Sequence, residues 1–314
     1  MTLQSRIEAA IDEATGEPAR FGASRTATGG CINDSRVVTL EDGREYFIKV
    51  SPGAAPYPGM FEAEFAALTL LGEPGVIRVP QPVAFGEDFI VVEAFREGKR
   101  RGDWQELMGR RLAQLHQATR SDRYGFERDN YLGTTQQPND WSSDWVTFWR
   151  QQRLGWQLDL FARKVSADDP LLAQGDRLLA RLDEIIGGLD EPPVLLHGDL
   201  WSGNAAAEER GEPVIFDPAS YYGRREAELG MMRLFGGFGP RCEAAYGEIW
   251  HHGVAVVIRG EAPAMVDSDA KFVMLAQASI QSMKDRPAGG HDVYWILAPG
   301  SRHSRPGPAR MTAV

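Results

Sequence analysis

Two short apolar runs that end in polar side chains constrain this chain more than any other feature. The first opens the segment VLLHGDLWSGN at residues 194–204, which carries Asp199 and, five positions later, Asn204. The second is VIFD at residues 214–217, and it ends in Asp217. Each run is typical of a buried strand, and alone each acid could be an ordinary turn residue or helix cap. The ordered set Asp199, Asn204 and Asp217 is much harder to obtain by chance.

The spacing between Asp199 and Asn204 is the one found in the catalytic loop of kinases. In that loop the aspartate orients the acceptor hydroxyl and takes its proton, while the asparagine oxygen binds Mg²⁺. A second acid on the following strand completes the metal site, and hard oxygen ligands suit Mg²⁺. The pattern therefore predicts Asp199 as the catalytic base, with Asn204 and Asp217 as metal ligands. For His197 we expect a structural, hydrogen-bonding role.

The N-terminal half contains side chains that would hold a nucleotide. Residues 45–50 predict a strand that carries Lys49, and burying a lysine there is costly without an anionic partner. Kinases use such a lysine to hold the α- and β-phosphates of ATP, and a helix glutamate fixes it. Glu64, on a helix expected over residues 60–71, is the candidate partner, and Glu62 is the alternative. Without the catalytic-loop motif, an edge-strand lysine and a surface glutamate would be the simpler interpretation.

Two further segments would complete the nucleotide site. The sequence GGC at residues 29–31 lies where kinases fold a loop over the phosphates, although the full G-x-G-x-x-G pattern is absent. Residues 89–95 resemble the hinge strand whose backbone binds adenine, and an ordinary linker would look similar. Cys31 is either a small loop residue or a reactive thiol. We assign these residues to nucleotide binding: Gly29, Gly30, Cys31, Lys49, Glu64, Glu93 and Phe95.

The remaining pattern predicts an α+β fold with a β-rich N-lobe, a mainly helical C-lobe and a cleft between them. Two strand-like runs flank Asp42-Gly43, which is a strong hairpin signal. Helices are expected over residues 3–15, 60–71, 104–118, 142–164 and 170–186. The expected divisions are residues 1–95 for an ATP-binding N-lobe, 96–250 for a C-lobe with the catalytic loop and substrate segment, and 251–314 for a divergent tail.

Charge and cysteine content exclude several classes of protein. The chain has 34 Lys and Arg against 44 Asp and Glu, a formal net charge of -10, which disfavours nucleic acid and anionic membranes as partners. It has no apolar run long enough for a transmembrane helix and no signal peptide. Its two cysteines exclude a disulfide framework and a four-cysteine zinc site. We therefore expect a reducing, cytoplasmic compartment.

Several motifs occur in one order along the chain, and their number makes the match specific. They are GCIN at 30–33, FIKV at 47–50, MFEAE at 60–64, LAQLH at 112–116, YGF at 124–126, QPNDW at 137–141, WVTF at 145–148, HGDLWSGN at 197–204, FDPASYYG at 216–223 and FGGF at 235–238. In these stretches the chain resembles the fructosamine-3-kinase (ketosamine-3-kinase) family, a branch of the protein-kinase-like fold near the aminoglycoside phosphotransferases. The resemblance covers residues 5–250.

The resemblance implies ATP- and Mg²⁺-dependent phosphorylation of the 3-hydroxyl of ketosamines, which are sugar adducts on amines, and hence a role in protein deglycation. It assigns Asp199, Asn204 and Asp217 the roles expected from their spacing. It also places substrate residues near the sugar, namely Trp201, Asn139, Trp141 and Trp145. Aromatic faces pack on sugar rings but also fill cores, and we expect a core role for at least two of the tryptophans in this segment.

Alternatives remain open. The acceptor could be an aminoglycoside or a choline-like amine, and the chain could be a pseudokinase that binds nucleotide without turnover. Residues 251–314 depart from the family's helical C-terminus, and their Gly-, Pro-, Ser- and Arg-rich end predicts disorder. A divergent tail, a frameshifted reading and a foreign C-terminal piece would each explain the departure. The protein is expected to be a monomer, or a redox-dependent homodimer if Cys31 forms an intermolecular disulfide.

Overall fold

A five-stranded antiparallel sheet organises the N-terminal half of the chain. The computed structural model describes residues 1–27, 33–51, 57–188 and 191–250. The sheet has the strand order β1-β2-β3-β5-β4. Its strands are β1 (Phe21–Thr26), β2 (Asp34–Leu40), β3 (Glu45–Val50), β4 (Pro82–Phe85) and β5 (Phe89–Glu93). The expected turn between β2 and β3 is present, and Gly43 takes a φ of 91°, which glycine adopts without strain.

Two helices cover opposite faces of this sheet. Helix α1 (Leu3–Thr15) and helix α2 (Met60–Gly72) have the bounds that their apolar periodicity predicts, to within a residue. In β5 successive side chains point to opposite faces. Val91 accordingly joins the apolar cluster around α1, while Ile90 joins the cluster around α2. Because both faces are covered, β5 is buried over most of its length.

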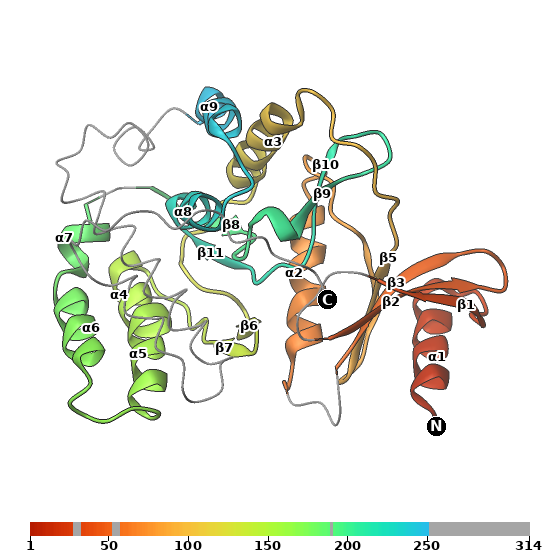
Figure 1. The fold of residues 1–314 in the computed structure, drawn as a ribbon, viewed down its shortest axis with the longest axis horizontal. Helices are drawn as coiled ribbons and strands as arrows, with labels where there is room; N and C mark the ends of the chain where they lie inside the picture. Colours follow the sequence, from red (N-terminus) through yellow and green to blue (C-terminus); the bar gives the residue numbers. More distant parts are fainter. Residues whose placement is uncertain (28–32, 52–56, 189–190, 251–314) are drawn as a thin grey trace, which may run out of the picture.

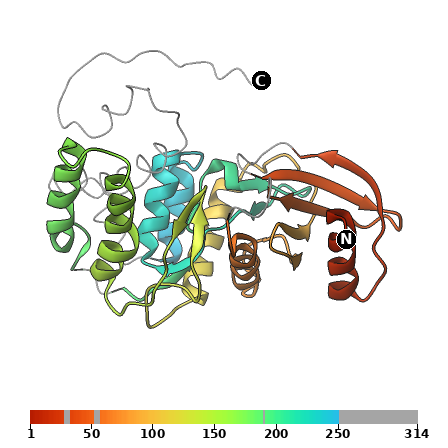
Figure 2. The same ribbon diagram turned by 90° about the horizontal axis from the view of Figure 1, so that it is seen from below.

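The C-terminal half is mainly helical, with short strands at its centre. Its helices are α3 (Trp104–Ala118), α4 (Trp145–Trp149), α5 (Gly155–Ala162), α6 (Pro170–Ala180), α7 (Leu182–Ile186), α8 (Arg225–Phe235) and α9 (Pro240–Ile249). Its strands are β6 (Asn130–Leu132), β7 (Thr135–Gln137), β8 (Val194–Leu196), β9 (Ala205–Ala207), β10 (Pro213–Ile215) and β11 (Tyr221–Gly223). Figures 1 and 2 both place the sheet and α1 at one end of the molecule and α4 to α7 at the other. The predicted α+β class is confirmed.

Two of the expected helices are divided. The helix expected over residues 142–164 consists of α4, a π-helical turn (Arg150–Leu154) and α5. The Gly155 N–H bonds the Arg150 carbonyl, five residues back, and a Cβ on Gly155 would lie 2.0 Å from that oxygen. Glycine therefore permits the wider turn. The helix expected over residues 170–186 is interrupted at Arg181.

The two halves share one hydrophobic core. Phe61 of α2 and Ile90 of β5 belong to the same buried cluster as Met108 of α3 and Leu195 of β8. All three residues of β8 are buried, as the continuous apolar run predicts. This shared core fixes the strand that leads into the catalytic loop relative to the sheet that carries Lys49. Among the described residues, no helix is long and apolar enough to span a membrane.

Candidate active site

The loop after β8 makes a tight turn against the segment that carries Asp217. Strands β8 and β9 flank the catalytic loop, residues 197–204, and they pair with β11 and β10, which flank residues 216–220. The two segments therefore lie side by side. Gly198 has a φ of 82°, and a Cβ at this position would lie 2.1 Å from the carbonyl oxygen of Ala219. A larger residue would collide with this backbone and would also be strained. The glycine in His-Gly-Asp is therefore required by the close approach of the two segments.

The structure brings the three residues of the predicted catalytic set together. Asn204 Nδ2 donates to the Asp199 carbonyl at 2.8 Å and to Asp199 Oδ2 at 3.0 Å. It also lies 3.5 Å from the Asp217 carbonyl oxygen. Because the amide nitrogen faces Asp199, the oxygen Oδ1 is the atom of Asn204 that can bind a cation. Among the described residues, no three His, Cys, Asp or Glu side chains form a metal cluster.

Lys49 reaches the same site from the sheet. Its Nζ lies 2.7 Å from Glu64 Oε1 and contacts Asp217 Oδ1. The side chains of Lys49 and Glu64 are 10% and 11% exposed, so the ammonium is placed between two carboxylates with little water. The structure thus pairs Lys49 with Glu64. The alternative partner, Glu62, instead forms a surface ion pair with Arg128 at 2.6 Å.

Burial governs the protonation of two side chains in the catalytic loop, those of Asp199 and His197. Desolvation raises the pKa of Asp199 to about 7, the hydrogen bond from Asn204 opposes this rise, and the charge of Glu228 adds to it. A carboxylate with a raised pKa is a better proton acceptor than an ordinary aspartate. Burial also lowers the pKa of His197, so that its ring is neutral near pH 7. Its Nε2 bonds the Phe216 carbonyl at 2.9 Å, which agrees with the expected structural role.

Asp217 has an unusual backbone conformation. With a φ of 63°, it is the one residue other than glycine that has a positive φ among those the structure describes. Such a conformation costs free energy and persists where neighbouring contacts enforce it. Here His197 holds the preceding carbonyl, that of Phe216, and the Phe216 N–H donates to the Asn204 carbonyl at 3.1 Å. The conformation is thus maintained by the catalytic loop itself.

The expected hinge is braced at Glu93. The Glu93 N–H donates to the Gln81 carbonyl at 2.8 Å, and its carboxylate pairs with Arg78 at 2.5 Å. These bonds hold the end of β5 to the segment before β4. The ring of Phe95 lies 5.8 Å from that of Phe216, which precedes Asp217. The phosphate-loop residues Gly29, Gly30 and Cys31 lie outside the described residues, as does the tail from residue 251.

Two exposed aromatic side chains flank the catalytic loop. Trp201 is 39% exposed, and Phe235, at the end of α8, is 48% exposed. The Ser202 N–H donates to the Gly236 carbonyl at 3.2 Å, so the end of α8 is bonded to the residue after Trp201. A Cβ on Gly237 would lie 2.0 Å from that of Ser202, so the two segments are in close contact. Sequence reasoning assigned Trp201 to the substrate and gave no role to Phe235.

The other three expected substrate residues lie elsewhere. Asn139 is 1% exposed, and its side chain bonds Arg153 at 2.7 Å and the Arg128 carbonyl at 3.1 Å. Trp145 is 4% exposed and packs against Tyr124 in the core. These two side chains therefore support the fold and do not line the surface of the catalytic loop.

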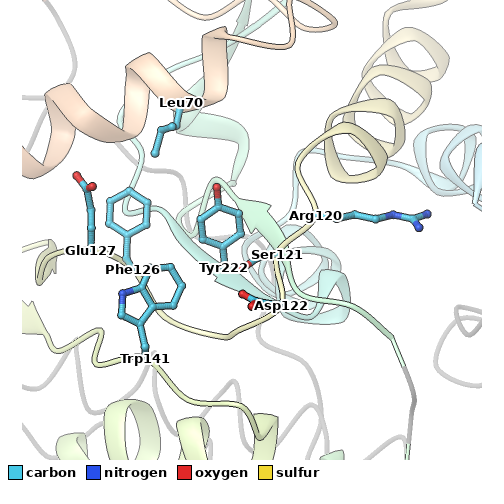
Figure 3. Close-up of a pocket in the computed structure, with 8 residues that line it drawn as sticks. All are labelled: Leu70, Arg120, Ser121, Asp122, Phe126, Glu127, Trp141 and Tyr222. Carbon is cyan, nitrogen blue, oxygen red and sulfur yellow. The ribbon is translucent and has the colours of Figure 1, made fainter.

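Trp141 is exposed and lines a hollow. Together with Phe126 and Tyr222 it lines a hollow of about 640 Å³ that also borders Leu70 of α2 (Figure 3). Neither the catalytic loop nor Asp217 contributes to its lining. Trp141 and Trp201, which were both expected near one sugar, thus do not line this hollow together.

Sequence reasoning missed Glu228, which is 1% exposed and accepts hydrogen bonds from the catalytic loop. A signal was available. On α8 it lies among the buried residues Arg225, Leu229 and Met232, and an acid on the apolar face of a helix is costly unless it has a partner.

Comparison with known proteins shows the family of this chain. The model of the fructosamine kinase family matches residues 3–255. A probable ketoamine kinase from Synechocystis is 40% identical over 234 residues, 73% of this chain and 76% of that protein. The chloroplastic protein-ribulosamine 3-kinase of Oryza sativa subsp. japonica is 40% identical over 227 residues, 70% of this chain and 65% of that protein.

A solved structure shows the same fold. The crystal structure of a fructosamine-3-kinase homologue from Thermobifida fusca superposes with a TM-score of 0.74 at 28% identity, covering 88% of this chain and 91% of that one. The two-lobed, protein-kinase-like architecture expected from the sequence is thereby confirmed. The family model and the relatives agree, and the chain belongs to the fructosamine kinase family.

Proposed function

We propose that this protein is an ATP-dependent kinase that phosphorylates the 3-hydroxyl of ketosamines and so acts in protein deglycation. The observation that carries the proposal is the meeting of two sets of residues from distant parts of the chain. Lys49, fixed by Glu64, contacts Asp217, which lies beside Asp199 and Asn204. Relatives of similar sequence are named ketoamine kinase and protein-ribulosamine 3-kinase.

In the proposed reaction Asp199 orients the acceptor hydroxyl and takes its proton. The carboxyl is buried, and its hydrogen bond from Asn204 fixes its orientation. The Lys49 ammonium would hold the phosphates of ATP, as strand lysines do in kinases, while Glu64 keeps it in place. The neutral ring of His197 maintains the turn through the Phe216 carbonyl.

The oxygen atoms present fit Mg²⁺. Asn204 Oδ1 and the Asp217 carboxylate are hard ligands, and Mg²⁺ is commonly bound by one or two protein oxygens together with phosphates and water. Asp217 already contacts one cation, the Lys49 ammonium, so its environment stabilises positive charge. When bound, the ion would neutralise charge on the transferring phosphoryl group.

The acceptor is expected to lie beside Trp201. This side chain is exposed, two residues from the base, and its indole lies over Gly203, where a Cβ would be 2.3 Å from the ring. A flat apolar face next to a proton acceptor suits a sugar ring with a reacting hydroxyl. The family match favours ketosamines over aminoglycosides or choline-like amines as acceptors.

A coupled assay of ADP release tests the proposal. The purified protein, ATP and MgCl₂ are incubated with ribulose-lysine, fructose-lysine, an aminoglycoside or choline. We expect release with a ketosamine alone, loss of release on chelation of the metal, and phosphate on the sugar 3-oxygen by NMR. ATP binding without ADP release on any ketosamine would contradict it and favour the pseudokinase.

A further inference from the structure

Glu228 binds the catalytic loop, although the proposed reaction uses it in no step. Its Oε2 accepts the His197 N–H at 2.5 Å, and its Oε1 accepts the Gly198 N–H at 3.2 Å. Both N–H groups belong to the turn between β8 and Asp199. The carboxylate therefore fixes, at two points, the backbone that orients the catalytic base.

This turn needs external support. Gly198 has a positive φ and gives the backbone more conformational freedom than any other residue would. The carbonyl of His197 accepts the Ala219 N–H at 2.9 Å, so one side of the turn is held by the Asp217 segment. Glu228 instead accepts hydrogen bonds from the two backbone N–H groups of the turn, those of His197 and Gly198. A hydrogen bond to an ionised acceptor is stronger than one between neutral groups.

A buried histidine lies behind the carboxylate. His116, on α3, is fully buried, and its Nε2 lies 3.9 Å from Glu228 Oε2. Its Nδ1 lies 2.8 Å from the Tyr246 hydroxyl. If the ring donated from Nδ1, the lone pair of Nε2 would face the carboxylate and repel it in a dry interior. The favoured arrangement has the Tyr246 hydroxyl donating to Nδ1 and a proton on Nε2, on the side of Glu228.

Tyr246 is itself firmly placed. It is 1% exposed on α9, and its ring meets that of His116 edge-on with centroids 5.7 Å apart. Helices α3 and α9 are in close contact, since a Cβ on Gly109 would lie 2.0 Å from the Cys242 carbonyl oxygen. Figure 1 shows the two helices side by side, next to α8. The hydroxyl of Tyr246 is thus held where it sets the proton position of His116.

We propose that Tyr246 is a positioning residue for the catalytic loop. Its hydroxyl fixes the tautomer of His116, the Nε2–H of His116 stabilises the Glu228 carboxylate, and that carboxylate holds the turn before Asp199. Helix α9, far from the catalytic loop in the sequence, thereby contributes to catalysis. The kinetic part of this inference rests on the proposed function, whereas the coupling of Tyr246 to the turn does not.

The first experiment compares two tyrosine-to-phenylalanine variants. Tyr246→Phe removes the hydroxyl and keeps the ring, and we expect kcat for the ketosamine to fall about fivefold, the scale of one buried hydrogen bond, with the KM for ATP unchanged. Tyr124→Phe is the matched control, because the Tyr124 hydroxyl is also buried and donates to the Glu191 carbonyl at 3.2 Å but has no contact with Glu228. Its kcat should equal that of the wild type.

Amide hydrogen exchange supplies a readout that needs no substrate. In Tyr246→Phe we expect the His197 and Gly198 amides to exchange faster than in the wild type, whereas in Tyr124→Phe they should be unchanged. Equal exchange and equal kcat in the two variants would overturn the inference. A wild type that does not turn over ketosamines would contradict the proposed function, and the exchange data would still test the coupling.

A double-mutant cycle tests the route through Glu228. Glu228→Gln replaces one acceptor oxygen by an NH₂ group, and we expect kcat to fall about thirtyfold or more. Adding Tyr246→Phe to this variant should lower kcat no further, because the hydroxyl acts through the carboxylate. An undiminished fivefold effect in the double variant would overturn the route. Should Glu228→Gln not fold, the exchange comparison of the single variants decides.

Discussion

The two sides of this active site are built by different physical means. On the sheet side, the Lys49 ammonium stands between two carboxylates, those of Glu64 and Asp217, so charge balances charge. On the catalytic-loop side, Asp199 has an amide, that of Asn204, as its hydrogen-bond donor, and its pKa is raised by burial. We expect the sheet side to hold a charged ligand and the catalytic-loop side to accept a proton.

The difference explains why the two sides should respond differently to mutation. Removing one member of a buried charge pair leaves an uncompensated charge, which affects both stability and ligand binding. Removing the charge of Asp199 instead relieves an unfavourable burial while it destroys the base. The first change should therefore act on the affinity for nucleotide, and the second on the rate of transfer.

The largest expected effect is on the catalytic-loop side. Asp199→Asn keeps the shape of the side chain but cannot accept the proton, so kcat should fall by about 10³-fold, within the range for general-base catalysis. The dissociation constant of ATP, measured by calorimetry, should change little, because Lys49 and Glu64 are intact. A large loss of ATP affinity in this variant would break the division between the two sides.

On the sheet side, Glu64→Gln should weaken nucleotide binding. The glutamine amide keeps a hydrogen bond to Lys49 but loses the negative charge. Because the Lys49–Glu64 pair is buried, this loss should raise the KM for ATP roughly tenfold. Glu62→Gln is the matched control, since Glu62 lies on the same helix and pairs with Arg128 at the surface. Its KM should stay at the wild-type value, and a similar rise in both variants would contradict the assignment.

Much of the fold follows from local sequence patterns. The apolar periodicity of α1, α2 and α3 and the turn at Asp42-Gly43 predicted elements that the structure contains. The π-helical turn within the helix over residues 142–164 did not follow, because apolar periodicity does not encode bonds that reach five residues back, such as that of the Gly155 N–H to the Arg150 carbonyl. Helix α8 was not anticipated either, since its buried face includes Arg225 and Glu228, which weaken the apolar pattern.

The candidate catalytic residues Asp199, Asn204 and Asp217 could be proposed from sequence because they lie close together in the chain and have a fixed spacing. Glu228 was missed because it acts on a turn about thirty residues earlier and its partner is backbone, and because its one signal, an acid on the buried face of a helix, requires α8 to be recognised first. For Asn139 and Trp145 the assignment to the substrate came from the family resemblance of their segment. The structure shows that both side chains are buried. Whether a polar or aromatic side chain faces a ligand or the core depends on tertiary packing, which the spacing of residues in the sequence does not encode.

Stability as a function of pH sharpens the contrast between the two kinds of environment. The pKa of Asp199 is raised from 3.8 to about 7, so the folded state binds its proton more tightly than the unfolded state does. Its contribution to stability is complete below about pH 4 and is lost as the pH rises through about 7. The free energy of unfolding of the wild type should therefore fall relative to Asp199→Asn over this range.

Asp144 should show the opposite dependence of stability on pH, because its pKa is lowered in the folded protein whereas that of Asp199 is raised. Its hydrogen bonds to Thr147, at the start of α4, hold its pKa below the ordinary value. The wild type should therefore lose stability relative to Asp144→Asn as the pH falls below about 4, and the two variants should differ in the sign of their slopes. Denaturant titrations at several pH values measure both. Slopes of equal sign would show that burial does not dominate at Asp199.

The smallest expected effect tests whether the catalytic-loop side extends to the end of α8. Phe235 is exposed, and the next residue, Gly236, accepts a backbone hydrogen bond from Ser202, which follows Trp201. If the acceptor contacts the Phe235 ring, Phe235→Ala should raise the KM for the ketosamine about threefold, the scale of one partly exposed aromatic contact. The KM for ATP should not change, because Lys49 is on the other side. Phe85→Ala is the matched control, since Phe85 is 41% exposed on β4 and contacts Phe65 rather than the loop. An equal change in both variants, or a change in the KM for ATP, would place Phe235 outside the acceptor site.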